Sequence, residues 1–391
     1  MARIPIKYNL RYLVTRWTST LTTALTFGLV VGVFVLVMAM VGGIERALGT
    51  SGDPMNVIIL RKGVQAEGQS VVQISQFQVI RNFNGIAKDS KSQPIVGPEV
   101  VVLVNKPRAR TGAPSNIQVR GVTPVSYELR PMVRIVEGRR PNSGMREIIV
   151  ARSIAQRFAL GLGEHVRLGK GDWKVVGLFE AGQSAFNSEV WADYRELMQE
   201  FDRNEYNTVI MRAADAAAIA ALKYQAENDP RIRLRGLTEE EYYNLQTSSS
   251  KPIKALGMFL AVIMSIGACF AGMNTMYASV SSRVREIGTL RILGFTPLAI
   301  MASFLIESMA LALIGGAVGC AVGSFVVSML GHAPTGTMNI DTFSEVVFYF
   351  TVTPALLLRA MIFALVMGII GGLLPARNAA KQPILEALRQ S

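Results

Sequence analysis

Two runs of the sequence, residues 18–44 and 255–282, contain no charged side chain. A helix needs about 20 apolar residues to cross the hydrocarbon core of a bilayer, so each run is long enough to span a membrane. Two more apolar stretches follow toward the C-terminus. The sequence therefore predicts an integral membrane α-helical protein with four transmembrane helices, at residues 18–46, 251–282, 296–330 and 354–374.

Basic residues are distributed unevenly around these helices. Lys and Arg flank them in residues 1–17, 283–295 and 375–391, whereas residues 331–353 contain neither. Short loops rich in Lys and Arg remain on the cytoplasmic side of a membrane. We therefore expect a multi-pass protein of the inner (cytoplasmic) membrane with both termini in the cytoplasm. The segment 283–295 is then a cytoplasmic elbow, 375–391 a cytoplasmic tail, and 331–353 a short extracytoplasmic loop.

Residues 1–17 alternate basic positions with apolar and aromatic ones at helical spacing. This pattern is typical of an amphipathic helix that lies in the inner membrane surface, with Trp17 at the level of the lipid headgroups. The alternative is that the segment is only the basic flank of the first transmembrane helix.

Residues 47–250 contain no apolar run long enough to span a membrane, and turn signals recur along them. They predict a large α+β extracytoplasmic domain between the first two transmembrane helices. Each end of this domain has a strand-helix-strand pattern, and its centre is mostly β. The end units are expected at 56–60, 75–86 and 100–104, and at 208–211, 214–227 and 231–235. The central strands are expected at 117–121, 147–151, 165–168, 173–179 and 189–192. We expect one lobe from the two end units, with a β-rich lobe inserted between them.

The composition argues against several other classes of protein. The formal charge of +12 could suggest nucleic-acid binding, but no zinc spacing or RNA-binding signature accompanies it. Cys269 and Cys320 lie inside apolar segments. His165 and His332 have no nucleophile or metal-ligand cluster beside them. The turn at residues 168–171 does not fit a phosphate-binding loop. We therefore expect no metal, no cofactor and no catalytic residue in this chain.

The elbow at residues 283–295 has the composition of a docking segment. Its arginines offer guanidinium groups to acidic residues of a partner, its apolar residues can fill a groove, and its glycines permit close approach or a tight end. The alternative is a solvated loop whose arginines contact lipid phosphates. The candidate coupling residues are Arg283, Arg285, Glu286, Ile287, Gly288, Leu290, Arg291 and Gly294.

The third transmembrane helix has two features of its own. Glu307 lies on the order of 15 Å along it, at about 1.5 Å per residue, and an ionisable group at that depth faces a partner or water. We favour a structural role with hydrogen bonds across helices; a proton or substrate site is the alternative. Gly315, Gly319 and Gly323 recur at four-residue spacing, which predicts a face for close helix packing.

Several segments resemble the MacB/FtsX-type permeases of ATP-binding-cassette transporters, also grouped as type VII. The resemblance rests on residues 279–294, on Phe304-Leu-Ile-Glu307 and on a tail motif, and it covers the whole chain. The segments 136–139, 147–150, 160–168 and 173–179 are similar to the family's outer domain, which has a porter-like lobe and an inserted lobe. The matching tail residues are Pro375, Ala376, Arg377, Pro383, Glu386, Ala387 and Leu388.

The resemblance implies a permease subunit that is not catalytic by itself and works by mechanotransmission. In such permeases two copies form a dimer, and each copy docks through the elbow on a cytoplasmic ATPase that binds ATP and Mg²⁺. MacB carries a fused ATPase ahead of its first helix, whereas only residues 1–17 precede the helix here. A separate ATPase chain is therefore expected as the partner.

The expected use of this motion is export or efflux of periplasmic cargo with a periplasmic adaptor and an outer-membrane duct. Two alternatives stay open, namely lipoprotein release from the inner membrane and FtsX-like regulation of a cell-wall hydrolase. A sensor without any ATPase is a further class. No ligand motif in the sequence chooses among them.

Overall fold

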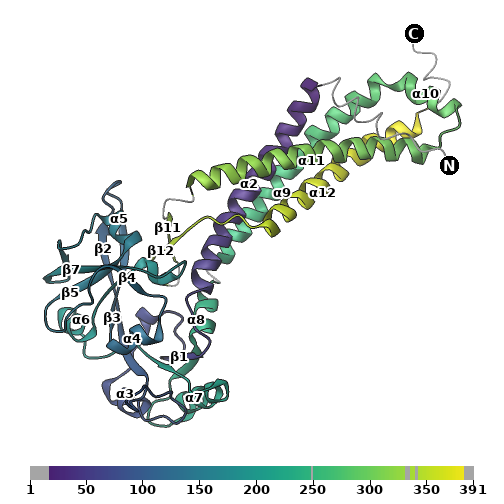
Figure 1. The fold of residues 1–391 in the computed structure, drawn as a ribbon. Helices are drawn as coiled ribbons and strands as arrows, with labels where there is room; N and C mark the ends of the chain where they lie inside the picture. The colour runs from purple at the N-terminus through teal and green to yellow at the C-terminus, as the bar shows by residue number, and fades with distance from the viewer. Residues whose placement is uncertain (1–16, 248–249, 331–334, 340–341, 383–391) are drawn as a thin grey trace. The chain divides into compact units, whose positions relative to one another are not determined.

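The computed structural model describes four stretches of the chain, residues 17–247, 250–330, 335–339 and 342–382 (Figure 1). The helix predicted for residues 1–17, apart from its last residue, lies outside the described residues. So do four residues of the tail motif, Pro383, Glu386, Ala387 and Leu388.

The chain divides into two compact units. The membrane unit contains residues 1–42, 252–332 and 350–391, and the outer unit contains residues 43–251 and 333–349. Four helices are long and apolar enough to cross a membrane, as predicted. Together with a short helix between the second and third they are α2 (Trp17–Gly49), α9 (Ser250–Ser282), α10 (Val284–Ile292), α11 (Pro297–Leu330) and α12 (Pro354–Lys381).

The predicted glycine face of α11 packs against α2. A Cβ atom added to Gly315 would lie 2.5 Å from the carbonyl oxygen of Ala24, and one added to Gly323 would lie 3.1 Å from Val35. Gly319 lies against Gly28 in the same way. Small side chains therefore let the two backbones approach closely, and the predicted packing face is confirmed.

The fourth transmembrane helix is longer than expected. We predicted its end at residue 374, but α12 continues through Pro375 to Lys381. Pro375 lacks the N–H group that would bond to the preceding turn. Ala376 and Ala379 are buried in an apolar cluster with residues of α9 and α11, and this burial offsets the missing bond. Pro375, Ala376 and Arg377 are thus helical residues and not part of an extended tail.

The outer unit is built on one ten-stranded sheet with the order β10-β1-β9-β2-β3-β8-β5-β7-β4, in which β6 pairs with β7. Its strands are β1 (Asn56–Leu60), β2 (Val96–Pro107), β3 (Pro114–Val122), β4 (Arg134–Gly138), β5 (Glu147–Ala151), β6 (His165–Leu168), β7 (Gly171–Glu180), β8 (Glu189–Asp193), β9 (Thr208–Arg212) and β10 (Arg235–Thr238). Its helices are η1 (Glu67–Gln69), α3 (Ile74–Ile80), α4 (Pro124–Leu129), α5 (Arg152–Phe158), η2 (Ala185–Ser188), α6 (Tyr194–Glu200), α7 (Ala216–Asn228) and α8 (Glu239–Gln246). This is the predicted α+β domain between the first two membrane helices.

Strand β2 joins the two predicted lobes. Its first residues, as far as Glu99, pair with β9, and from Val100 onward it pairs with β3. The prediction placed only a short strand at 100–104. The longer strand makes the inserted β-rich part continuous with the rest of the sheet, and Glu99 lies where the pairing changes.

Two elements near the ends of the domain were misplaced from sequence. The helix expected at 75–86 ends at Ile80, because the side-chain amide of Asn82 donates to the carbonyl of Gln78 and the chain turns at Gly85 with φ of +96°. The last strand was expected at 231–235. Arg233 has φ of +48°, so the chain turns there and β10 begins only at Arg235.

The outer loop at 331–353 contains a hairpin, β11 (Thr335–Met338) paired with β12 (Glu345–Phe348). The prediction gave it no secondary structure. The four residues of β12 are buried, and the hairpin belongs to the outer unit. Although it lies between the third and fourth membrane helices in sequence, it is therefore part of the extracytoplasmic domain.

Candidate functional site

The elbow is a short helix bounded by two breaks. Helix α9 ends at Ser282, and Arg283 has non-helical dihedrals of −117° and 16° before α10 begins. After α10 the chain turns at Gly294, whose φ of +88° suits glycine. Thr296 then accepts the N–H of Ala299 through its hydroxyl oxygen, and Pro297 opens α11. The elbow predicted between the second and third membrane helices is present.

The side chain of Arg283 points into the membrane unit. Its Nη1 lies 2.8 Å from Oε2 of Glu307, its Nε lies 3.2 Å from Oε2 of Glu286, and it is only 4% exposed. The hydroxyl of Ser279 donates to the other oxygen of Glu307 at 3.3 Å. Arg283 was expected to offer its guanidinium to a partner protein. Its burial corrects that expectation, because Glu307 on α11 already takes the guanidinium.

The apolar face of α10 is also turned inward. Ile287 is 2% exposed and belongs to an apolar cluster with Ile300 and Phe304 of α11. Gly288 is buried and Leu290 is half-buried. Ile287 therefore does not supply the partner-facing surface that we predicted; it anchors α10 to the membrane unit.

A different apolar surface is exposed at the end of the elbow. The exposed fractions are 58% for Ile292, 70% for Leu293 and 71% for Leu298. Arg285 is exposed on the same short helix, and Arg291 is half-buried. Sequence reasoning passed over this patch, although three large apolar residues around the turn at Gly294 were a visible signal.

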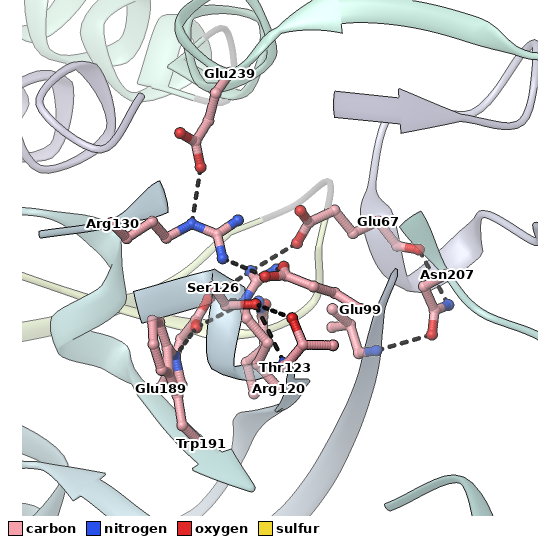
Figure 2. Close-up of polar contacts among 12 residues, drawn as sticks. Glu67, Glu99, Arg120, Thr123, Ser126, Arg130, Glu189, Trp191, Asn207 and Glu239 are labelled. Carbon is pink, nitrogen blue, oxygen red and sulfur yellow. Dashed lines mark hydrogen bonds and ion pairs between the residues drawn. The ribbon is translucent and has the colours of Figure 1, made fainter. Parts of the chain in front are cut away.

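The outer unit holds a second and larger group of charges, which we call the junction cluster. Arg120 on β3 reaches three carboxylates. Its Nη1 lies 2.8 Å from Glu99, and its Nη2 lies 2.7 Å from both Glu67 and Glu189. Arg130, just after α4, lies 2.5 Å from Glu99 and 2.9 Å from Glu239. Figure 2 shows these side chains converging; they come from β2, β3 and β8, from η1, from the end of α4 and from the start of α8. The cluster comprises Glu67, Glu99, Arg120, Arg130, Glu189 and Glu239.

Burial and ion pairing act in opposite directions on these carboxyl groups. Burial alone raises the pKa of Glu99, but Arg130 and Arg120 outweigh it and lower that pKa to about 2. For Glu67 burial is the stronger effect, and the pKa is raised despite the attraction of Arg120. Arg120 and Arg130 have raised pKa values because the carboxylates outweigh the effect of burial. The four carboxyl groups are therefore not equivalent.

A third charged group joins the β11–β12 hairpin to the inserted part of the sheet. Glu345 of β12 lies 3.0 Å from Nη2 of Arg108 and also contacts Arg157 and the hydroxyl of Ser115. Its side chain is buried. The sequence marked Glu345 only as one of two acids in a loop without basic residues, and it did not reveal these partners.

No group of three or more His, Cys, Asp or Glu side chains is arranged to hold a metal ion within the part of the chain that the structure describes. The groups that can do chemistry here are ion pairs and an exposed apolar patch.

Two family models match the chain. Residues 258–384 match the FtsX-like permease C-terminal model, and residues 20–229 match the MacB-like periplasmic core domain model. The second match alone covers more than half of the chain.

Three curated relatives illustrate the similarity. The uncharacterized ABC transporter permease YknZ of Bacillus subtilis (strain 168) is 28% identical over 264 residues, which cover 63% of this chain and 62% of YknZ. The macrolide export ATP-binding/permease protein MacB of Bdellovibrio bacteriovorus is 26% identical over 396 residues, 92% of this chain and 57% of that protein. MacB of Escherichia coli (strain K12) is 28% identical over 238 residues, 58% of this chain and 35% of that protein. The chain thus spans less than two thirds of the length of these relatives.

Two solved structures are also similar. The extracellular domain of YknZ from Gram-positive bacteria has a TM-score of 0.35 at 14% identity, covering 47% of this chain and 98% of that one. The periplasmic region of MacB from Actinobacillus actinomycetemcomitans has a TM-score of 0.38 at 11% identity, covering 49% of this chain and 92% of that one.

Proposed function

This chain belongs to the MacB-like, FtsX-like family of ABC transporter permeases, and from that membership we propose that it transmits the motion of a separate cytoplasmic ATPase to its outer unit. The proposal rests on the elbow, which has one buried surface and one exposed apolar surface. One side of α10 is fixed to the membrane unit, and the other end presents exposed Ile292, Leu293 and Leu298. We propose that this turn faces the cytoplasm, where large exposed apolar residues mark a protein contact.

The buried side of α10 connects the elbow to α11. Arg283 ties the start of α10 to Glu307 on α11, and Ile287 packs into the same apolar cluster. A displacement of the docked elbow must therefore move α11, because a buried pair resists separation. Arg285 provides an exposed guanidinium beside the apolar patch for an acidic group on the ATPase.

Two segments next to the membrane helices in sequence, the β11–β12 hairpin and α8, are attached to the outer unit. The hairpin between α11 and α12 is held in the outer unit by Glu345, and Ser188 accepts the N–H of Val347 at 2.6 Å. Helix α8 is held there by Glu239. Motion of α9 can thus reach the sheet along the chain through α8 and β10, and motion of α11 and α12 can reach it through the contacts of the hairpin. This supports a mechanical device in which no substrate needs to pass through the helices.

We propose that both termini are cytoplasmic, that the protein lies in the inner membrane, and that two copies work together with two ATPases. Export of extracytoplasmic cargo with an adaptor is the favoured use, because several relatives are named as macrolide exporters. Lipoprotein release and regulation of a cell-wall hydrolase are the competing uses. An adaptor, a lipoprotein chaperone or a hydrolase recovered with the chain would choose among them.

Affinity purification of the tagged full chain from native membranes tests the proposal. We expect an ATPase to co-purify with the intact chain and to be lost with Leu293→Asp, which places a charge in the apolar patch. Leu162→Asp is the matched control, because Leu162 is a leucine of the outer unit that is 50% exposed. If no ATPase accompanies the intact chain, or if both variants retain it equally, the proposed coupling is wrong.

A further inference from the structure

The junction cluster contains more negative than positive groups. Its four carboxyl groups and two guanidinium groups are all buried, so full ionisation would leave two uncompensated negative charges away from water. Burial of uncompensated charge is strongly unfavourable, and buried groups commonly respond by binding a proton. The question is which carboxyl group relieves the excess.

Three of the four carboxylates have partners on both oxygens. Glu189 accepts from Arg120, from the indole N–H of Trp191 at 2.7 Å and from the amide of Gln118 at 2.8 Å. Glu99 is bound by Arg120 through one oxygen and by Arg130 through the other. Both oxygens of each of these two carboxyl groups therefore have hydrogen-bond donors.

Glu239 is stabilised in a different way. Arg130 binds one oxygen, while the amide of Asn56 and the backbone N–H of Asp53 donate to the other at 2.9 and 3.2 Å. Glu239 is also the first residue of α8, where the unpaired N–H groups of a helix favour negative charge. Both oxygens of Glu239 therefore have donors.

Glu67 is the exception. Its Oε2 lies 2.7 Å from Arg120, which Glu99 and Glu189 share, and its Oε1 is buried without a hydrogen-bond partner among the described residues. A cavity of about 30 Å³ borders Glu67. A cavity needs roughly 10–15 Å³ to hold one water molecule, so this one has room for a water whose oxygen accepts a hydrogen bond from a protonated carboxyl group.

We propose that Glu67 holds a proton in the folded protein, and that the junction cluster is a proton-binding site. The groups that face Glu67 are Arg120 and Glu189 from the strands, Tyr242 and Tyr243 from α8, and Glu345 from β12, all of which line the same cavity, with Glu99 and Arg130 behind Arg120. Burial keeps both tyrosines neutral by raising their pKa. Glu345 forms ion pairs with Arg108 and Arg157. The raised pKa of Glu67 agrees with this assignment.

The protonation state of Glu67 affects the contact between this residue and α8. The backbone N–H of Glu67 donates to the hydroxyl of Tyr242 at 3.1 Å, and Gln246 donates to the same hydroxyl. Tyr242 and Gln246 belong to α8, and α9 follows α8 in the chain. Loss of the proton adds a negative charge that the two arginines of the cluster do not balance, and it therefore weakens the contact between η1 and α8 as pH rises through the folded-state pKa of Glu67.

Thermal unfolding of the full chain in detergent, followed by tryptophan fluorescence across pH 6 to 9, tests the site. Trp173 and Trp191 are buried in the outer unit and report on it. We expect the wild-type Tm to fall as pH rises. Glu67→Gln imitates the protonated group, so its Tm should equal or exceed that of the wild type at the alkaline end and vary less with pH.

Glu99→Gln is the matched control, since it changes the same functional group in the same cluster. It should lower Tm by about 5 °C or more at every pH, because it removes the carboxylate that Arg120 and Arg130 share and leaves Arg130 with Glu239 alone. An equal loss of Tm in Glu67→Gln and Glu99→Gln at alkaline pH would overturn the proposal. So would a wild-type pH dependence that Glu67→Gln leaves unchanged.

Infrared spectroscopy gives a second test that does not depend on stability. The difference spectrum between the wild type and Glu67→Gln at neutral pH should contain the C=O stretching band of a protonated carboxylic acid. If the lost signal is that of an ionised carboxylate, Glu67 is not protonated and the inference fails.

Discussion

The two units of the molecule each contain a buried arginine–glutamate system, and the two systems differ in balance. In the membrane unit one arginine, Arg283, meets one fully buried carboxylate, Glu307, while its second partner Glu286 is partly exposed. In the outer unit two arginines meet four buried carboxyl groups. A pair of equal and opposite charges, such as Arg283 and Glu307, holds the start of α10 against α11. An unbalanced cluster carries charge that a proton can change, so the same chemistry gives stiffness in one place and pH sensitivity in the other.

The largest expected effect comes from removing the arginine that most carboxylates share. Arg120→Met leaves Glu67 and Glu189 without their guanidinium partner, and breaking a buried pair costs about 3–5 kcal/mol. We expect the outer unit to unfold at much lower denaturant concentration, measured by tryptophan fluorescence.

Arg152→Met is the control for this change. Arg152 also joins two carboxylates, Glu137 and Glu180, but its side chain is 40% exposed. Exposed pairs contribute about 0–1 kcal/mol. If both variants shift the unfolding midpoint equally, the charge network does not determine the stability of the outer unit.

The next effect separates the balanced pair from the unbalanced cluster. Arg283→Met and Glu307→Met should each destabilise the membrane unit by about 3 kcal/mol, because each leaves the other charge buried. The double variant should recover most of the loss, since an apolar pair can replace a balanced ion pair. A thermal-unfolding double-mutant cycle in detergent measures this. Additive losses would mean that the two residues do not act as a pair.

A smaller and more local effect is expected at the β11–β12 hairpin, where two arginines share one carboxylate. Glu345→Gln leaves two arginines, Arg108 and Arg157, without their shared carboxylate, but both are partly accessible to water. We expect a loss of about 1–3 kcal/mol, seen as faster hydrogen exchange of the Val347 amide. Glu137→Gln, in an exposed pair, should leave that amide unchanged. Unaltered protection in Glu345→Gln would show that apolar burial alone holds the hairpin.

Much of the architecture could be predicted from local sequence patterns. The four apolar runs fixed the membrane helices, and alternating hydrophobicity with turn residues located strands such as Asn56–Leu60 and Glu147–Ala151 at their observed bounds. The spacing of small residues identified the face of α11 that meets α2. These signals succeed because each depends on neighbours within a few turns or strand residues.

The charged sites were less predictable for the same reason. Arg283 and Glu307 were both singled out, but as separate features, since nothing in their spacing of 24 positions indicates contact. Arg108 and Glu345 are 237 positions apart. The only local mark of the junction cluster was a charged residue inside an apolar strand, as at Glu99. The apolar face of the elbow was assigned to a partner protein because the sequence pattern identifies an apolar face but not what covers it. In the structure α11 covers Ile287.

One measurement tests directly whether ATP drives the outer unit. Tyr224→Cys, an exposed site on α7, can carry a spin label in a background with Cys269→Ala and Cys320→Ala. The distance between labels on two copies would be measured in membranes with the co-purified ATPase, with and without ATP and Mg²⁺. We predict that ATP shifts the distance distribution. An unchanged distribution while ATP is being hydrolysed would contradict transmission from the elbow to the outer unit.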